Sequence, residues 1–484
     1  MQQNKVGEPK LFKHYGHFSL AFLFVFSTLS AETFENFKRT QAESVKEYKD
    51  KRDKEFSKYL KAQWKAYKSQ NDAPLYEKPK LSKIIPSIPL NIKSAGPKIS
   101  VAVNDINYTE NKYVPLVKEK KDFYLNFYGS DLGFDIPNGI LLANYYPQNQ
   151  KGIKNFFDLA SSSEHEELIL EILNIKKSMN LNDWGVYLLV VDISNAIFKN
   201  HNNSNLLSWF IFNKLGYAVK IGLYDDHVIL LHHSEKTIYS AQNYLLGKKK
   251  YYMFSYNDKS SIGHIYTYKQ NYPGSDKPLD FSMKTLPLFN LNIKTKILSF
   301  TKDEKHYNIS YEYNKNLIDF MRTYPQVDYK IFFNAPLQEA TYNSIAFSLK
   351  KYIDGMKMSD AINFVLNFVQ NSFKYERDDK QFTKEKVMFA QETLYYDKSD
   401  CEDRVILFSY LAKKLFKIGV VGVKYKDHMA TALAIPMQGD SVESGGKRLV
   451  IADPTYINAS IGQSMAKYKY LIPDSFIKGH LLKP

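Results

Sequence analysis

The sequence predicts an α+β protein with an N-terminal helical arm, and three observations lead to this fold class. Near the N-terminus, aromatic residues recur among charged ones at three- and four-residue steps, the period of an amphipathic helix. The middle of the chain mixes helical runs with short strand-like runs. The last third has helices first and strands after them, the order of an α+β domain. With 484 residues, 44% hydrophobic and 24% charged, the chain has a globular composition and room for several domains.

The first segment has the pattern of a secretory signal peptide. An uncharged, mostly apolar run from Phe18 to Ala31 follows Lys5, Lys10 and Lys13 and ends in small residues. We therefore predict a signal peptide over about residues 1–31 and a periplasmic or otherwise exported protein; an uncleaved anchor is the alternative. Elsewhere in the sequence, apolar runs stay shorter than the roughly 18 residues of a membrane span, which argues against a polytopic protein.

Residues 32–71 are expected to form one or two amphipathic helices. Their regularly spaced apolar residues include Phe34, Tyr48, Phe56, Trp64 and Tyr67. Such an arm packs on the main body or on a partner helix, and the alternative is a peripheral helix on a membrane surface. Prolines then recur over residues 72–97, which predicts an extended linker and a domain boundary.

Residues 98–313 are expected to form an α+β middle domain. Strands are predicted over 99–103, 123–128 and 140–145, helices over 152–216, and further strands over 217–224, 227–232, 264–268 and 293–313. The region 314–484 is expected to be a separate domain. It should have helices over 342–353 and 359–373, the second capped by Ser359, and a third from Asp400 or Cys401 to about Lys417. Strands over 419–425, 429–435 and 448–452 should follow, with a turn over 439–446.

Charge and composition exclude several function classes. The net charge is +15, but the 66 basic residues include only six Arg, and base-edge recognition depends on Arg. We therefore expect no nucleic-acid partner; an anionic membrane surface or cell-wall polymer fits the Lys excess better. The single cysteine, Cys401, rules out an internal disulfide framework, a multi-cysteine zinc site and an iron–sulfur cluster. The sequence has no Gly-rich phosphate loop, HExxH or Gly-x-Ser-x-Gly motif, so we expect no cofactor and no metal.

Three residues have the order and placement of a catalytic triad. Cys401 stands at a predicted helix start, where the helix dipole favours the thiolate, although Asp400, Glu402 and Asp403 oppose it. His428 opens a predicted strand and could serve as base and acid. Asp453, at the end of the next strand, could orient the imidazole. Singly, each residue has an ordinary structural explanation; their joint order and spacing favours the catalytic one.

At these residues the sequence resembles the transglutaminase-like cysteine protease superfamily. The resemblance covers about residues 314–465 and rests on three stretches: Asp400-Cys401-Glu402-Asp403 with the following helix, His428-Met429-Ala430-Thr431, and Asp453-Pro454-Thr455-Tyr456. It implies a papain-like fold, with Cys401 as nucleophile, His428 as general base and acid, and Asp453 as orienting carboxylate. By analogy, the backbone N–H of Cys401 would contribute to the oxyanion hole. The sequence departs from the family in the residues after His428 and in a longer loop before Asp453.

The expected function is that of an exported cysteine hydrolase or acyltransferase acting on amide bonds. Its substrate would be a protein or peptide of the cell envelope, such as a cell-wall peptide, and a thioester on Cys401 would be resolved by water or by an amine, with hydrolysis favoured. The alternative is a catalytically inactive protein that keeps this fold for binding or scaffolding.

Two further patterns concern the middle region. Residues 203–231 align with 401–433 with a one-residue gap that matches His227 to His428 and puts His201 in the place of Cys401. This indicates either a degenerate second copy without the nucleophile or two unrelated helix–strand–strand units. His232-His233 invites a metal-site interpretation, but adjacent strand residues face opposite sides and cannot easily share an ion. The acidic cluster Asp397, Asp400, Glu402 and Asp403 lacks calcium-loop spacing.

Overall fold

The computed structural model describes residues 23–62, 64–70, 86–90, 93–108, 113, 120–254 and 262–479. The chain divides into two compact units, Met1–Phe56 and Ser57–Pro484. A helix, α1 (Leu23–Ala62), contains all of the first unit's described residues, and its last residues belong to the second unit. Most of the predicted signal peptide lies outside the described residues. Within the part that is described, no helix combines the length and apolarity needed to cross a membrane.

The prediction of a helical arm up to residue 71 is wrong at its C-terminal end. Trp64–Gln70 forms a strand, β1, which pairs antiparallel with β8 (His264–Tyr268) and β6 (Asn243–Leu246). The Trp64 ring packs edge-on against Tyr268, its ladder partner, at 5.3 Å between centroids. Pairing with residues far along the chain therefore outweighs the local helical pattern.

The middle region begins with a hairpin followed by helices. The hairpin is β2 (Phe123–Phe127) with β3 (Ser130–Phe134), and the helices are α2 (Asn138–Leu141), α3 (Gln150–Ser161), α4 (Glu166–Ser178), α5 (Asp183–Ile197) and α6 (His201–Lys214). The predicted helical stretch 152–216 is confirmed as α3–α6. Two predicted strands are wrong. Residues 99–103 have no strand, although Ile99 and Val101 bond to the 354–356 turn, and residues 140–145 contain the end of α2 because Pro137 starts a helical turn.

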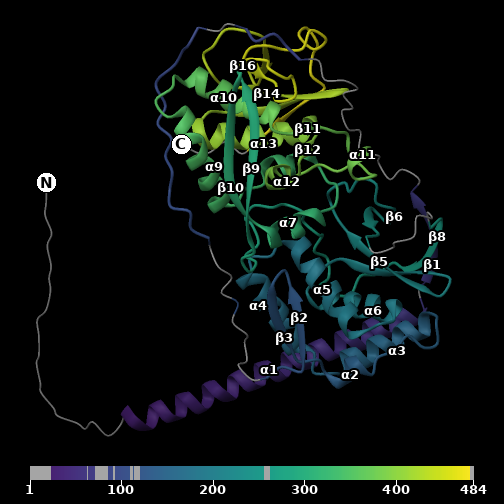
Figure 1. Cartoon of the computed structure of the whole chain (residues 1–484). Coiled ribbons are helices and arrows are strands. Elements are labelled where there is room, and N and C mark those ends of the chain that lie inside the picture. Colours follow the sequence, from purple (N-terminus) through teal and green to yellow (C-terminus); the bar gives the residue numbers. More distant parts are fainter. Residues whose placement is uncertain are drawn as a thin grey trace, which may run out of the picture. The chain divides into compact units, whose positions relative to one another are not determined.

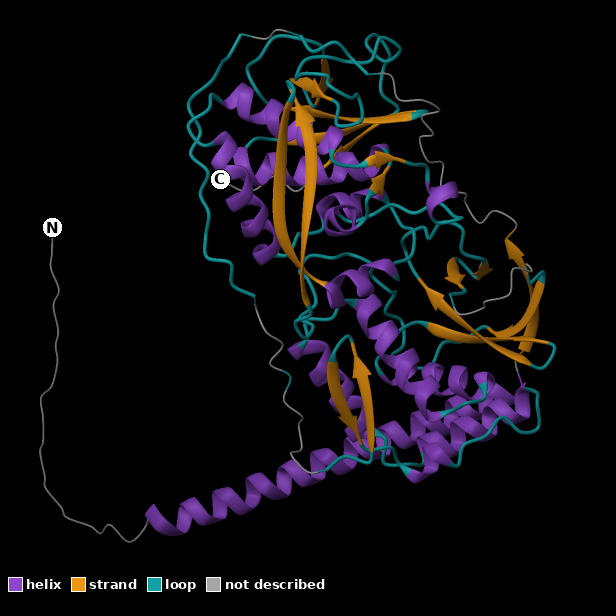
Figure 2. Cartoon of the chain, viewed as in Figure 1, coloured by secondary structure: helices purple, strands orange, loops and turns teal. Residues whose placement is uncertain are grey.

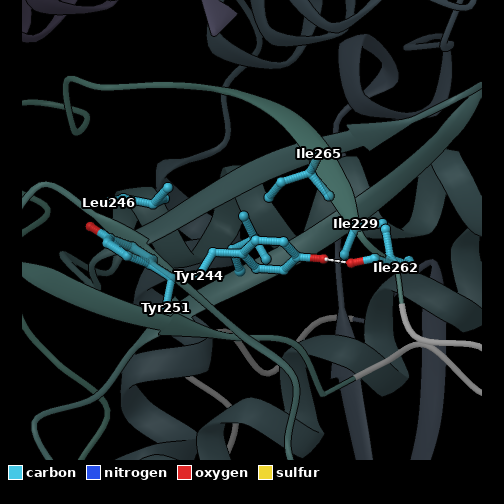
Figure 3. Packing of buried hydrophobic residues seen from close by; sticks show 7 residues of the cluster. Ile229, Tyr244, Leu246, Tyr251, Ile262 and Ile265 are labelled. Carbon is cyan, nitrogen blue, oxygen red and sulfur yellow. Dashed lines mark hydrogen bonds between the residues drawn. The ribbon is translucent and has the colours of Figure 1, made fainter. Parts of the chain in front are cut away.

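Helix α6 packs on a sheet that closes into a barrel. The strand order is β1-β6-β7-β5-β4-β8, with β4 (Val219–Tyr224), β5 (His227–His233) and β7 (Lys249–Tyr252) completing the set. Figure 3 shows the interior, where Tyr244 and Tyr251 lie among Ile229, Leu246 and Ile265, and the Tyr244 hydroxyl donates to the Ile262 carbonyl at 2.9 Å. Aliphatic and aromatic side chains together thus fill the barrel, which has a packed core.

A long hairpin connects the middle region to the C-terminal region. Strands β9 (Ile293–Lys302) and β10 (Lys305–Asn314) pair along their whole length and pack on α9 (Glu339–Ile353) and α10 (Met358–Asn371) (Figure 2). Helices α7 (Lys315–Arg322) and α8 (Tyr329–Asn334) lie between hairpin and α9 in sequence. Ser359 is inside α10, whose N-cap is Lys357, so the predicted cap is wrong. Its hydroxyl accepts instead from the Ala95 backbone N–H at 2.8 Å.

The C-terminal region places one long helix beside a five-stranded antiparallel sheet (Figure 1). The shorter elements that lead to it are β11 (Lys374–Tyr375), α11 (Asp378–Gln381), α12 (Ala390–Tyr395) and β12 (Lys398–Ser399). They are followed by α13 (Cys401–Phe416), β13 (Val420–Tyr425), β14 (His428–Leu433), β15 (Ser441–Ser444), β16 (Lys447–Ala452) and β17 (Ser475–Lys478). The α+β fold class is confirmed, and the predicted helix and strands of this region are present. The predicted turn over 439–446 contains β15.

The barrel and the C-terminal sheet share one topology. The sheet order β15-β16-β14-β13-β17 repeats the barrel order β6-β7-β5-β4-β8, with each strand in the same place along the chain after a helix, α13 or α6. The two central hairpins, β4–β5 and β13–β14, each have six residue pairs and a two-residue turn. The last pair before the turn is Tyr224↔His227 in the first hairpin and Tyr425↔His428 in the second. Agreement over a helix and five strands favours a second copy over two unrelated units. The strand β1, which closes the barrel, is the main difference.

Candidate active site

Cys401 is the first residue of α13, as the sequence predicts. Asp400 is the N-cap, and Asp400 and Asp403 form a capping box in which each side chain accepts from the other residue's backbone N–H. The four residues Cys401–Arg404 are all fully buried. A buried carboxylate or guanidinium needs hydrogen-bond partners, so this helix start depends on the polar groups around it.

His428 and Asp453 form a buried hydrogen-bonded pair. The His428 Nε2 lies 2.7 Å from Asp453 Oδ2, with the histidine 0% and the aspartate 2% exposed. The other carboxylate oxygen, Oδ1, accepts from the backbone N–H groups of Thr455 and Tyr456 at 2.9 and 3.1 Å. These bonds hold the carboxylate in one orientation, and the carboxylate fixes which imidazole nitrogen carries a proton toward it.

Two neighbouring tyrosine rings pack beside the imidazole. The Tyr468 ring stacks on His428 at 4.7 Å, and the Tyr425 ring lies parallel to it at 6.4 Å. Burial, together with the charge of Asp453, raises the pKa of Tyr425 to about 12. Burial and a hydrogen bond to Asp427 raise the pKa of Tyr468 well above its ordinary value, with the charges of Cys401 and Asp453 contributing. Both phenols therefore stay neutral, and the two buried rings form one aromatic cluster with the imidazole.

The structure does not join the thiol to the imidazole. The Cys401 Sγ donates to Glu402 Oε2 at 3.1 Å, whereas His428 Nδ1 is buried without a hydrogen-bond partner in the described part of the chain. A carboxylate that accepts from a thiol favours the protonated thiol, which is the unreactive form. To form a thiolate–imidazolium pair, the thiol must exchange its hydrogen bond to Glu402 for one to His428 Nδ1. This is the imidazole nitrogen that is not bonded to Asp453.

Two positioning residues were missed by the sequence reasoning. The Gln370 side-chain amide, on α10, donates to the carbonyls of Asp453, Tyr456 and Ala459 at 2.9, 2.8 and 3.1 Å. The fully buried Arg404 donates to Ser399 Oγ and to the carbonyls of Gln370 and Phe373. Through Gln370 and Arg404, the start of α13 and the Asp453 loop are linked. An Arg one turn after Cys401, directly before the apolar run that begins at Val405, is the sequence signal that could have indicated this link.

Three buried carboxylates near the site could hold a cation. Asp378, Asp400 and Asp403 each offer an oxygen within 4.8 Å of the others, the one such group found among the described residues. An all-carboxylate set suits magnesium or calcium and does not suit zinc. Two of these carboxylates also stabilise the local backbone. Asp378 accepts from the Lys386 backbone N–H at 2.6 Å, and Asp403 accepts from the Met388 backbone N–H at 2.8 Å.

His232 and His233 do not form a metal site in the described structure. His233 Nδ1 bonds to the Lys250 carbonyl at 2.8 Å, while the His232 ring packs among aromatic rings at Tyr187, Phe212 and Phe254. This agrees with the expectation from strand geometry that the two side chains face opposite ways.

Comparison with known proteins gives one partial match. No family model matches the chain, and no solved structure matches it. Over 130 residues, 27% of the chain, it is 32% identical to a protein from Yaba-like disease virus named "Probable metalloendopeptidase G1-type". The chain covers 20% of that relative's length, about a fifth, so the similarity is confined to a segment of each protein.

Proposed function

We propose that the chain is a cysteine-dependent enzyme of transglutaminase-like type that cleaves or transfers amide bonds of envelope proteins or peptides. The observation that carries this proposal is the buried, oriented pair of His428, on β14, and Asp453, directly after β16, in the sheet region beside the helix that Cys401 begins. The resemblance at the same three residues supports it. The partial similarity to a protein named as an endopeptidase supports hydrolysis of peptide bonds in general.

The metal implied by that relative's name does not fit the residues that the structure describes. Catalytic zinc sites use His, Glu or Cys ligands around an open position, and the described residues that could bind a metal together are three aspartates. We therefore derive no step through a metal. The proposed nucleophile is the thiol.

The reaction would begin when His428 Nδ1 takes the thiol proton and the Cys401 sulfur attacks the carbonyl carbon of the substrate amide. The C–N bond then breaks as His428 returns the proton to the leaving amine, which leaves a thioester on Cys401. Water or an amine, deprotonated by His428, then attacks the thioester. The C–S bond breaks, the acyl group leaves as a carboxylic acid or a new amide, and His428 returns the proton to the sulfur. Asp453 keeps the imidazole oriented and stabilises its charged form throughout.

The test combines a substrate-free and a substrate-based measurement. The rate of Cys401 alkylation by iodoacetamide is followed against pH in the wild type, in His428→Ala and in the matched control His227→Ala, which alters the exposed counterpart of His428. We expect a reactive thiol at a pH below its ordinary pKa of about 8.5, lost in His428→Ala and kept in His227→Ala. We also expect cleavage of a mixed peptide library that Cys401→Ala abolishes and a metal chelator does not.

A second candidate is a non-catalytic binding or scaffolding protein with this fold. The complete burial of Cys401 and its bond to Glu402 favour this candidate. It predicts slow alkylation that does not depend on His428, and no library cleavage. Chelator-sensitive cleavage that survives Cys401→Ala would contradict both candidates.

A further inference from the structure

The segment before β17 is bonded through its backbone to the rest of the molecule at its two ends. Just before it, the Gly462 N–H donates to the Ile451 carbonyl at 2.7 Å, and just after it, the Asp474 N–H donates to the Lys424 carbonyl at 2.8 Å. The backbone–backbone hydrogen bonds that residues 465–473 form within the described part of the chain are internal to the segment. Few backbone bonds therefore oppose its movement away from the sheet.

One buried side chain holds this segment against the sheet. Tyr468 is 3% exposed, whereas the other eight side chains of residues 465–473 are partly or fully exposed. The Tyr468 ring stacks on the His428 imidazole at 4.7 Å and lies 5.0 Å from the Tyr425 ring. Met465 is partly buried against the same cluster. The main apolar contact of the segment is therefore made at the imidazole itself.

The remaining attachments are side-chain contacts near the surface. The Tyr468 hydroxyl donates to Asp427 Oδ1 at 3.0 Å, and Lys467 forms an ion pair with the other oxygen of Asp427. Lys469 pairs with Asp440 at 3.2 Å. The Lys467 and Lys469 side chains are 61% and 43% exposed. Ion pairs at such exposure contribute little to stability, so they hold the segment only weakly.

The groups proposed to react are closed off in the structure. Cys401 and His428 are each 0% exposed, and Asp453 is 2% exposed. Burial and the hydrogen bond to Asp427 raise the pKa of Tyr468 above its ordinary value, and the charges of Cys401 and Asp453 raise it further. The phenol thus lies within electrostatic reach of both groups. A substrate carbonyl has to touch the sulfur, so a path to these buried groups must open before any reaction.

We propose that residues 465–473 form a lid that closes the Cys401–His428 site by placing Tyr468 on the imidazole, and that substrate enters when this ring leaves. Opening breaks the side-chain contacts of the lid with Asp427, while its two ends stay bonded. The inference rests on the proposed function, which makes Cys401 and His428 the reacting groups. The lid itself can be tested without a substrate.

The test is the rate of Cys401 alkylation by iodoacetamide in the full chain, where this is the single cysteine. Rates are compared at the plateau of each pH profile, so that a changed thiol pKa does not enter. Tyr468→Ala should raise the rate by at least about tenfold, because burial of the ring no longer holds the lid closed. Asp427→Ala, which keeps the ring, should raise it about threefold. Tyr470→Ala, which alters a tyrosine of the same segment that is 87% exposed, is the control and should react as the wild type does.

Urea distinguishes opening of the lid from unfolding of the whole chain. Below the unfolding transition, the wild-type alkylation rate should vary little with urea, because lid opening exposes much less surface than unfolding does. A urea dependence as steep as that of global unfolding would overturn the proposal, since the thiol would then be reached only through unfolding. An unchanged rate in Tyr468→Ala, or an equal rise in Tyr470→Ala, would overturn it as well. If thermal unfolding shows that Tyr468→Ala has lost its fold, Asp427→Ala decides, and an unchanged rate in that variant counts against the lid.

The double variant Tyr468→Ala/His428→Ala separates this inference from the proposed function. A fast rate in Tyr468→Ala that persists at every pH in the double variant supports the lid and contradicts the proposed chemistry. An unchanged rate in Tyr468→Ala, together with a pH profile that depends on His428, contradicts the lid and supports the chemistry.

Discussion

The buried side chain of His232 lowers the stability of the folded protein. It is fully buried, and neither ring nitrogen has a hydrogen-bond partner among the described residues. Burial lowers its pKa from 6.5 to about 3. Its place in the β4–β5 ladder, opposite Val219, is the place of Leu433 opposite Val420 in the C-terminal sheet. A leucine at this position therefore fits the same topology without polar atoms.

We predict that His232→Leu stabilises the protein, by about 1–3 kcal/mol at pH 7, because two unpaired buried nitrogens are removed. The gain should grow in acid. Below pH 6.5 the unfolded state binds a proton that the folded state does not bind until about pH 3, so wild-type stability falls over this range. At pH 5 this effect adds about 2 kcal/mol to the difference in the free energy of unfolding between His232→Leu and the wild type.

Urea unfolding at pH 7 and pH 5 measures both effects. The control is His227→Leu on the same strand, whose side chain is 52% exposed and should give little change at either pH. A His232→Leu variant that is less stable than the wild type, or a difference that does not grow at pH 5, would contradict this account.

At the scale of elements, α10 fixes the loop that follows β16. The Gln370 side-chain amide donates to three carbonyls of that loop, including the one of Asp453, and the backbone carbonyl of Gln370 accepts from Arg404 of α13. Gln370 thus sets the position of Asp453 relative to the helix that carries the thiol. It acts through other residues and is a positioning residue.

We predict that Gln370→Leu lowers stability by about 2–4 kcal/mol, because buried carbonyls lose their donor. It should also weaken the dependence of thiol alkylation on His428, measured well below the melting temperature. Asn371→Ala, whose side chain makes two long contacts of 3.3 and 3.4 Å, is the control and should change neither quantity appreciably. Unchanged stability and an unchanged alkylation profile in Gln370→Leu would show that the three bonds do not position Asp453.

The same elements show how far the sequence leads. The helix α13 and the hairpin β13–β14 follow from local periodicity, so the places of Cys401 and His428 were predictable, and the contact between His428 and Asp453 follows from strand order. The catalytic roles stay predictions. The strand β1 was not predictable, because Trp64 pairs with Tyr268 across the whole middle region. The hydrogen bond from Cys401 to Glu402 was not predictable either, because a glutamate in the first turn of a helix indicates capping and not a partner for a thiol.

At the scale of the whole molecule, Ser57–Pro484 is one compact unit, and the reason lies in the β9–β10 hairpin. Phe300 of β9 packs on Phe364 and Phe368 of α10 at 5.5 and 5.7 Å between ring centroids. Tyr311 of β10 is 1% exposed and donates its hydroxyl to the Leu394 carbonyl. The hairpin precedes the boundary at residue 314 expected from the sequence, but its apolar side chains are buried against the helices that follow.

We therefore predict that residues 314–484 do not fold stably alone. Residues 290–484 should fold more stably, because only this longer fragment contains the hairpin that covers α9 and α10. Removing the hairpin exposes several buried aromatic and aliphatic side chains, each worth about 1.5–3 kcal/mol, which is enough to exceed the stability of a typical domain. Near-UV circular dichroism and thermal unfolding of both fragments measure this. The full chain should show one cooperative transition over 57–484. If 314–484 unfolds cooperatively at the same temperature as 290–484, the hairpin is dispensable and the boundary expected from the sequence is the physical one.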